Sequence, residues 1–136
     1  MILKKGFALL LLAIAVLAAG FLNAIAQDFN FTSKSPEALQ YLQQGIAKND
    51  AFALNEAYAL YEQAIKADPE CAIAYYFSSL TAVNNDDFLK KINKAVELSG
   101  NSSEPEKMLI LAQKNIIDGR ADLARGHFNK LIELLP

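Results

Sequence analysis

The sequence predicts an all-α fold of three stacked helix-turn-helix hairpins over residues 35–136. Three observations lead to this prediction. Apolar residues recur at steps of three and four, which is the period of an α-helix. Turn signals divide the chain into six such segments, and long strand-like alternation is absent. The pattern also restarts after 34 and 33 residues, from Tyr41 to Tyr75 and then to Met108.

The segment 1–26 has the pattern of a signal peptide. Two lysines near the start precede an apolar run over 7–22, and an Ala-Ile-Ala triplet ending at Ala26 supplies the small residues that a signal peptidase reads, which places the cut before Gln27. The 21 residues of 6–26 are also long enough to span a bilayer, so a signal-anchored membrane protein is the alternative. We expect an exported protein that is periplasmic, extracellular or in the cell envelope.

Charge and cysteine usage exclude several classes of partner and scaffold. The formal net charge is −2, and it becomes more negative without the two N-terminal lysines. This balance gives no attraction to nucleic acid or to anionic lipid. Cys71 is the only cysteine, so no disulfide framework is available. We expect its thiol to be buried, and an intermolecular bridge is the alternative.

The first hairpin follows a short polar arm over 27–34, whose Phe29 and Phe31 lie on one side of an extended chain and are expected to dock on the helices. The first helix is predicted over 36–48, with Ser35 as its cap. The second ends at Ala67, because Asp68 precedes a proline. The residues predicted to point inward are Ala38, Leu39, Tyr41, Leu42, Ile46, Ala57, Leu60, Tyr61, Ala64 and Ile65.

The second hairpin is predicted over 72–83 and 87–98, with Asp86 as cap of its second helix and Gly100 as a plausible C-cap. The third starts at a Ser103 cap, turns at Asp118-Gly119 and runs on as a helix over 120–135. The residues predicted to point inward are Phe88, Ile92, Ala95, Val96, Leu123, Ala124, Phe128, Leu131 and Ile132, and Lys90, Lys91 and Lys94 are predicted to point outward.

Small and aromatic residues recur at matching places in the repeats. Large side chains would hold two closely crossing helices apart, so small residues are expected at the crossing. The recurring small residues are Gly45, Ser79 and Ala112 on the first helices, and Ala57 and Ala124 on the second. Tyr61 and Phe128 follow one turn later and should fill the space toward a neighbouring hairpin. Pro69 and Pro136 close the first and last units at the same distance.

This arrangement resembles the tetratricopeptide repeat. Matching residues are Tyr41, Gly45, Ala57, Tyr61, Ala64 and Pro69 in the first unit, Tyr75, Ser79 and Ala95 in the middle, and Met108, Leu111, Ala112, Ala124, Phe128 and Pro136 in the last. Gln44 and Lys48 depart from the pattern, and the middle unit has a shorter turn and ends at Gly100. The repeats would cover about 38–71, 72–104 and 105–136, and the resemblance implies that they form a right-handed superhelical solenoid.

The resemblance implies that the first helix of each hairpin lines a concave groove that holds a peptide or a partner helix. The residues expected to face this groove are Leu42, Ile46, Ile73, Tyr76, Leu80, Leu109 and Gln113. They are mostly apolar, so we expect recognition of an apolar or amphipathic segment. Clamping of carboxylate tails is not implied, because Leu42, Ile46, Phe77 and Ile110 stand at comparable places. The alternative is that the N-terminal arm or a second copy of the chain covers the groove.

No catalytic, cofactor-binding or metal-binding motif is present, so we expect a non-enzymatic scaffold without cofactors. His127 lacks partners in the sequence and is expected to be a solvated surface residue. The alternatives are a regulatory or targeting repeat domain of a larger enzyme or of a secretion or envelope assembly. Two alternatives stay open for the C-terminal end, a fragment of a longer repeat protein or a homo-oligomer, because no further helix comes after a group of apolar residues there. They are Phe128, Leu131, Leu134 and Leu135.

Overall fold

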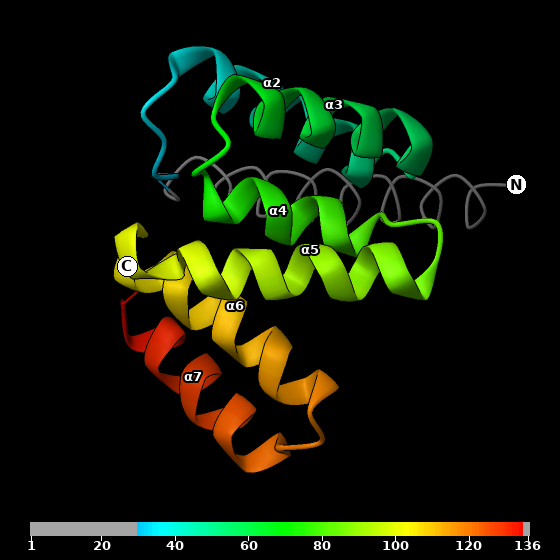
Figure 1. The fold of residues 1–136 in the computed structure, drawn as a ribbon. Helices are drawn as coiled ribbons and strands as arrows, with labels where there is room; N and C mark the ends of the chain where they lie inside the picture. The colour runs from blue at the N-terminus through cyan, green and yellow to red at the C-terminus, as the bar shows by residue number, and fades with distance from the viewer. Residues whose placement is uncertain (1–29, 135–136) are drawn as a thin grey trace, which may run out of the picture. The chain divides into compact units, whose positions relative to one another are not determined.

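A computed structural model describes residues 30–134 of the chain, in which six α-helices follow one another (Figure 1). They are α2 (Pro36–Asp50), α3 (Leu54–Ala67), α4 (Ala72–Leu80), α5 (Asn85–Leu98), α6 (Glu104–Ile117) and α7 (Ala121–Leu134), and a short 3-10 helix η1 (Ser99–Asn101) follows α5. The predicted signal peptide, Phe29, Leu135 and Pro136 lie outside the described residues. None of the described helices combines the length and the apolar character that crossing a membrane requires.

The helices pack as three antiparallel pairs, α2 with α3, α4 with α5, and α6 with α7. Neighbouring pairs join through α3 with α4 and through α5 with α6, and α4 also contacts α6. The three turns within the pairs lie at one end of this stack, and the connections between pairs lie at the other (Figure 1). The predicted architecture of stacked helical hairpins is therefore confirmed, and no strand occurs between residues 30 and 134.

The helix ends differ from the expected ones in several places, and α4 ends at Leu80, three residues before its predicted end. α2 continues to Asp50, and the turn falls at Phe52, which has a φ of 58°. Asn84, and not Asp86, caps α5, since its Oδ1 accepts the Asp87 N–H at 2.9 Å. Gly100 lies within η1 and not in a left-handed C-cap. Ser35 is the cap of α2 as predicted, because its Oγ accepts the Ala38 N–H at 3.2 Å.

The core lies where the first two hairpins meet. Its fully buried members include Leu42, Ala57, Tyr61, Ala64, Ile73, Ala74, Ile92, Ala95 and Ile110. Gly45 allows α2 and α3 to approach as predicted. A Cβ at Gly45 would stand 2.7 Å from Tyr61 Cδ1 and still nearer to Cε1, closer than any real contact. The close neighbour is thus the Tyr61 ring, which itself stacks on Phe77 with the ring centroids 5.6 Å apart.

Three predicted side-chain directions are wrong. Lys91 was expected to point outward, but it is buried. Leu123 and Ile132 were expected inward, but they are 53% and 69% exposed. One physical reason explains all three. A helix of a stacked array is covered on each side that meets another hairpin, and it is exposed elsewhere. α5 has hairpins on both sides, whereas α7 packs chiefly on α6 within the described residues.

The arm docks on the helices, as predicted, through the part that the structure describes. The Phe31 ring meets the Phe77 ring edge to face at 5.7 Å. The Thr32 N–H donates to Glu106 Oε1 at 2.7 Å, and the Ser33 hydroxyl donates to Asp68 Oδ2 at 2.5 Å. These contacts join α6 and the α3–α4 connection to one extended segment, so the arm is an integral part of the fold.

Candidate functional site

The seven predicted groove residues lie on the first helices of the three hairpins, but they differ widely in exposure. Leu42 on α2 and Ile73 on α4 are fully buried, and Tyr76 is 7% exposed. Their side chains therefore belong to the core and not to a binding surface in this conformation. The expectation that Leu42 faces a groove is wrong, because Leu42 is a central member of the core.

The remaining four predicted residues have accessible side-chain surface. Leu80, at the end of α4, is 47% exposed. Ile46 on α2 and Leu109 on α6 are half-buried and pack with their inner sides against the core, and Gln113 is also half-buried. Together they leave one accessible side chain or more on each of α2, α4 and α6. Of the seven predicted residues, only these four have side chains that a partner could reach in this conformation.

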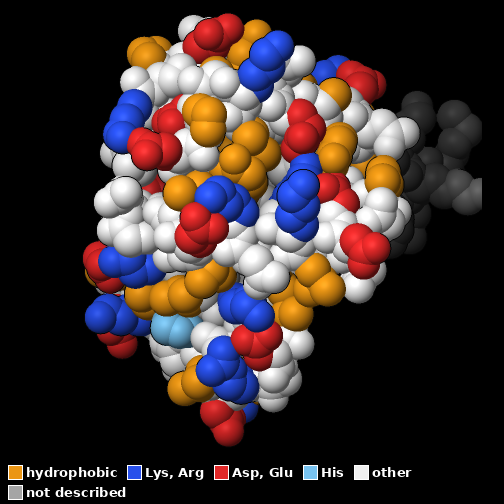
Figure 2. Space-filling model, viewed as in Figure 1, with side chains coloured by type: hydrophobic (Ala, Val, Ile, Leu, Met, Phe, Trp, Pro, Cys, Tyr) orange, Lys and Arg blue, Asp and Glu red, His pale blue; other side chains and the backbone are white. Residues whose placement is uncertain are grey.

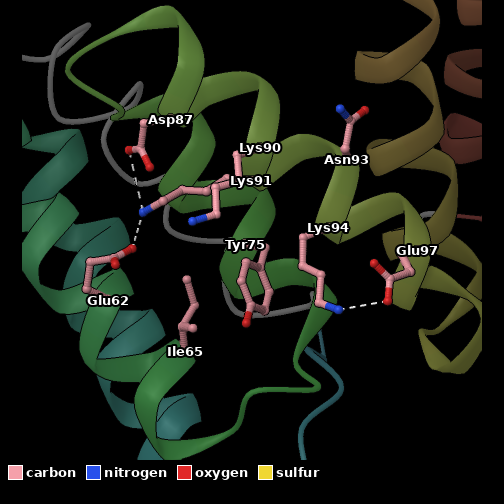
Figure 3. Close-up of a pocket in the computed structure, with 9 residues that line it drawn as sticks. All are labelled: Glu62, Ile65, Tyr75, Asp87, Lys90, Lys91, Asn93, Lys94 and Glu97. Carbon is pink, nitrogen blue, oxygen red and sulfur yellow. Dashed lines mark hydrogen bonds and ion pairs between the residues drawn. The ribbon is translucent and has the colours of Figure 1, made fainter.

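A second candidate surface, which the sequence did not reveal, lies on the second helices. A pocket of about 600 Å³ opens between α3, α4 and α5 (Figure 3). Its lining residues are Glu62, Ile65, Tyr75, Asp87, Lys90, Lys91, Asn93, Lys94 and Glu97. Ile65 and Tyr75 supply an apolar side, and the rest of the lining is polar or charged. In the space-filling view, hydrophobic side chains are interspersed with charged ones (Figure 2).

Lys91 anchors one wall of this pocket through several partners at once. Its ammonium forms ion pairs with Glu62 and, at 3.6 Å, with Asp87 (Figure 3). It also donates to Ser78 Oγ at 2.7 Å and to the Tyr58 hydroxyl at 3.0 Å. The same nitrogen lies 4.2 Å from the centroid of the Tyr58 ring, a cation–π distance. This network fastens α5 to α3 and α4.

The electrostatics of the cluster keep Lys91 charged. Burial by itself lowers the pKa of Lys91, but the hydrogen bonds with Glu62 and Tyr58 raise it, and the net result is a pKa above the ordinary value. A lysine that is charged and fully engaged cannot serve as a base or nucleophile at neutral pH. The cluster is therefore best explained as a structural fastening. Lys94 is similarly engaged with Glu97 at 2.7 Å.

Two buried carboxylates hold the arm. Glu106 is fully buried, and its Oε2 accepts the N–H and the hydroxyl of Ser103, at 2.8 and 2.9 Å. Asp68 accepts from Ser33, from the Lys34 N–H at 2.9 Å and from a third donor in the following turn. Burial raises the pKa of Asp68, but these hydrogen bonds together lower it below its usual range. Both carboxylates hold the arm by hydrogen bonds, and neither faces a large cavity.

The residues expected to have no functional role lie as follows. Cys71 is buried as predicted, and burial raises the pKa of its thiol to about 11. His127 is half-buried, with Nδ1 3.4 Å from Met108 Sδ, so it is less solvated than expected. Within residues 30–134, no three His, Cys, Asp or Glu side chains converge in a way that could hold a metal ion.

Comparison with known proteins adds no relative to this description. No family model matches the chain, and neither a curated protein nor a solved structure is significantly similar to it. The chain is therefore defined by its architecture, an all-helical domain of six helices packed as pairs in the described residues.

Proposed function

We propose that this chain is an exported protein of the tetratricopeptide-repeat type that binds an apolar or amphipathic segment of a partner protein. The 34- and 33-residue spacing and the recurring small residues support the family. The signal-like segment 1–26 supports export to the periplasm, the cell envelope or the exterior. The proposal is non-enzymatic, because the sequence lacks the motifs that catalysis requires.

One observation carries the binding hypothesis. α2, α4 and α6 occupy the same place in three consecutive hairpins, and each presents accessible side chains of the predicted set, namely Ile46, Leu80, Leu109 and Gln113. An extended or helical segment that runs across the hairpins would meet these side chains in succession. Leu42, Ile73 and Tyr76 would then form the packed floor beneath the contact and not the contact itself.

Site-specific photo-crosslinking in the native cell envelope tests this proposal. A photoreactive amino acid at Leu80 or Leu109 should crosslink a partner protein. The same probe at Gln63, an exposed position on α3, is the matched control. Crosslinks of equal yield from Gln63, or none from Leu80 and Leu109, would reject the first-helix surface. Tyr76 is unsuitable as a probe, because it is nearly buried and its replacement would disturb the core.

A further inference from the structure

A stripe made of three apolar residues and Arg125 runs along one side of α7. Ala121, Arg125, Phe128 and Ile132 follow one another at steps of four, three and four residues, so they lie on one side of the helix. Ile132 is 69% exposed, and Phe128 is only half-buried. Within the described residues, α7 packs chiefly on α6. Ile132 is thus the most exposed large hydrophobic residue in the described helices.

The internal repeat indicates what kind of element covers such a stripe. Arg125, Phe128 and Ile132 stand 67 residues after Tyr58, Tyr61 and Ile65 on α3. On α3 these positions are covered by the next hairpin. Tyr61 is fully buried and stacks on Phe77 of α4, and the Tyr58 hydroxyl donates to Asp87 of α5 at 3.0 Å. The repeat therefore specifies a packed helix as the occupant of the α7 stripe.

The first helix of another copy is a poor occupant. If α2 of a second copy covered α7 as α4 covers α3, then Gln43 would stand where Phe77 stands, 34 residues earlier in the repeat. Gln44 would take the place of Ser78. Both glutamines are exposed and polar, so α2 lacks the aromatic partner that Tyr61 finds in Phe77. Open-ended stacking of copies, head to tail, is accordingly disfavoured.

We propose that the occupant is α7 of a second copy, so that the chain forms a two-fold dimer through this stripe. Two such helices in antiparallel contact bring the two Phe128 rings near the symmetry axis and place Arg125 of one copy level with Ile132 and Glu133 of the other. Arg125 and Glu133 are both exposed, and the nearest acid to Arg125 is the highly exposed Asp122 at 3.4 Å. Two symmetric Arg125–Glu133 pairs would form, which gives charge complementarity at both ends of the stripe. This dimer does not depend on the proposed peptide-binding function.

Sedimentation velocity of protein expressed from the full sequence tests the dimer. We expect a dimer at tens of micromolar, and Ile132→Glu should raise the dissociation constant at least tenfold. Leu123→Glu is the matched control, because Leu123 is an exposed leucine on the opposite side of α7. Circular dichroism of both variants verifies the fold. A monomeric wild-type protein overturns the proposal, as does equal weakening by both variants or no weakening by Ile132→Glu.

Disulfide trapping tests the same interface without purification of the chain. Asn129 lies beside Phe128 near the expected axis, so Asn129→Cys should give an intermolecular disulfide, whereas Leu123→Cys should not. Cys71 does not interfere, because it is buried. Arg125→Glu and Glu133→Arg should each weaken the dimer, and the double variant should restore it. Trapping through position 123 alone, or no restoration by the double variant, would reject the antiparallel arrangement.

Discussion

α3 and α7 occupy the same position in two repeats, yet their environments differ. On α3, Tyr61 is fully buried and Ile65 packs against the core. On α7, their counterparts Phe128 and Ile132 are half-buried and largely exposed, respectively. Both helices carry an aromatic residue and an isoleucine at these two positions, so the residue types alone do not explain the difference in burial. It comes from the neighbour, because α4 packs against α3 and the Tyr58 hydroxyl reaches Asp87 of α5.

The comparison shows that a repeat pattern places apolar side chains on one surface of a helix. Whether that surface is buried depends on what packs against it. In a stacked array each hairpin contacts only its neighbours, so the stability of a helix depends on the hairpin packed next to it. The first two hairpins share an aromatic cluster and a buried lysine network, and the arm contacts them at Phe77 and Asp68. In α7, only Ala124 and Leu131 are buried. We therefore expect substitutions in α7 to lower the stability of the protein less than substitutions in α3.

The largest expected difference concerns the two equivalent aromatic residues. Tyr61→Ala should lower the free energy of unfolding by about 3–5 kcal/mol, since it leaves a cavity beside Phe77. Phe128→Ala should cost only about 1–1.5 kcal/mol, because the side chain is half-exposed. Urea denaturation measures both values. Equal losses would mean that α7 is covered to the same degree as α3, which the proposed dimer would also produce at high protein concentration.

Tyr61→Phe separates the ring of Tyr61 from its hydroxyl. The Tyr61 hydroxyl is buried and has no hydrogen-bond partner among the described residues. Its removal should therefore leave stability unchanged or raise it by up to about 1 kcal/mol. A loss of more than about 1 kcal/mol in the same urea experiment would instead show that this hydroxyl is hydrogen-bonded in solution.

Replacing each of two helical glycines with alanine should change the stability by an intermediate amount, in opposite directions at the two positions. Gly45→Ala should destabilise the protein by about 1–3 kcal/mol, because the new methyl group would overlap the Tyr61 ring. Gly126→Ala on α7 meets no atom within 4 Å and should stabilise by about 0.5–1 kcal/mol through helix propensity. Thermal or urea unfolding checks both. A stabilising Gly45→Ala would show that α2 and α3 separate more easily than their packing indicates.

The smallest expected effect is the pH dependence that comes from Asp68, which holds the docked arm. The folded-state pKa of Asp68 is below its ordinary value, so the ionised carboxylate stabilises the fold above about pH 4. That contribution should be lost as the pH falls through the folded-state pKa. Asp68→Asn should therefore be less stable than wild type at pH 7, and the gap should narrow toward pH 2. Asp122→Asn, at an exposed α7 position, is the control for replacement of a surface carboxylate.

Much of the fold could be predicted from local signals, whereas the candidate surfaces could be predicted only in part. Helical period, the Ser35 cap and the Asp118-Gly119 turn are determined by residues close in sequence, and these predictions are confirmed. Lys91 could not be predicted, because its burial depends on Tyr58, Glu62 and Ser78, which come from two other helices. The pocket beside it arises from the same junction, so no sequence motif indicates it.

The sequence by itself determined six helical segments and the three-hairpin order, because periodicity, caps and turns act over a few residues. It also determined the close approach at Gly45, since only a residue without a side chain fits against Tyr61. The tertiary structure decided which apolar side chains became core. Leu42 and Ile73 are buried while Leu80 and Ile132 are exposed. The physical reason is that burial depends on the neighbouring hairpin, and the identity and position of that neighbour are properties of the stack.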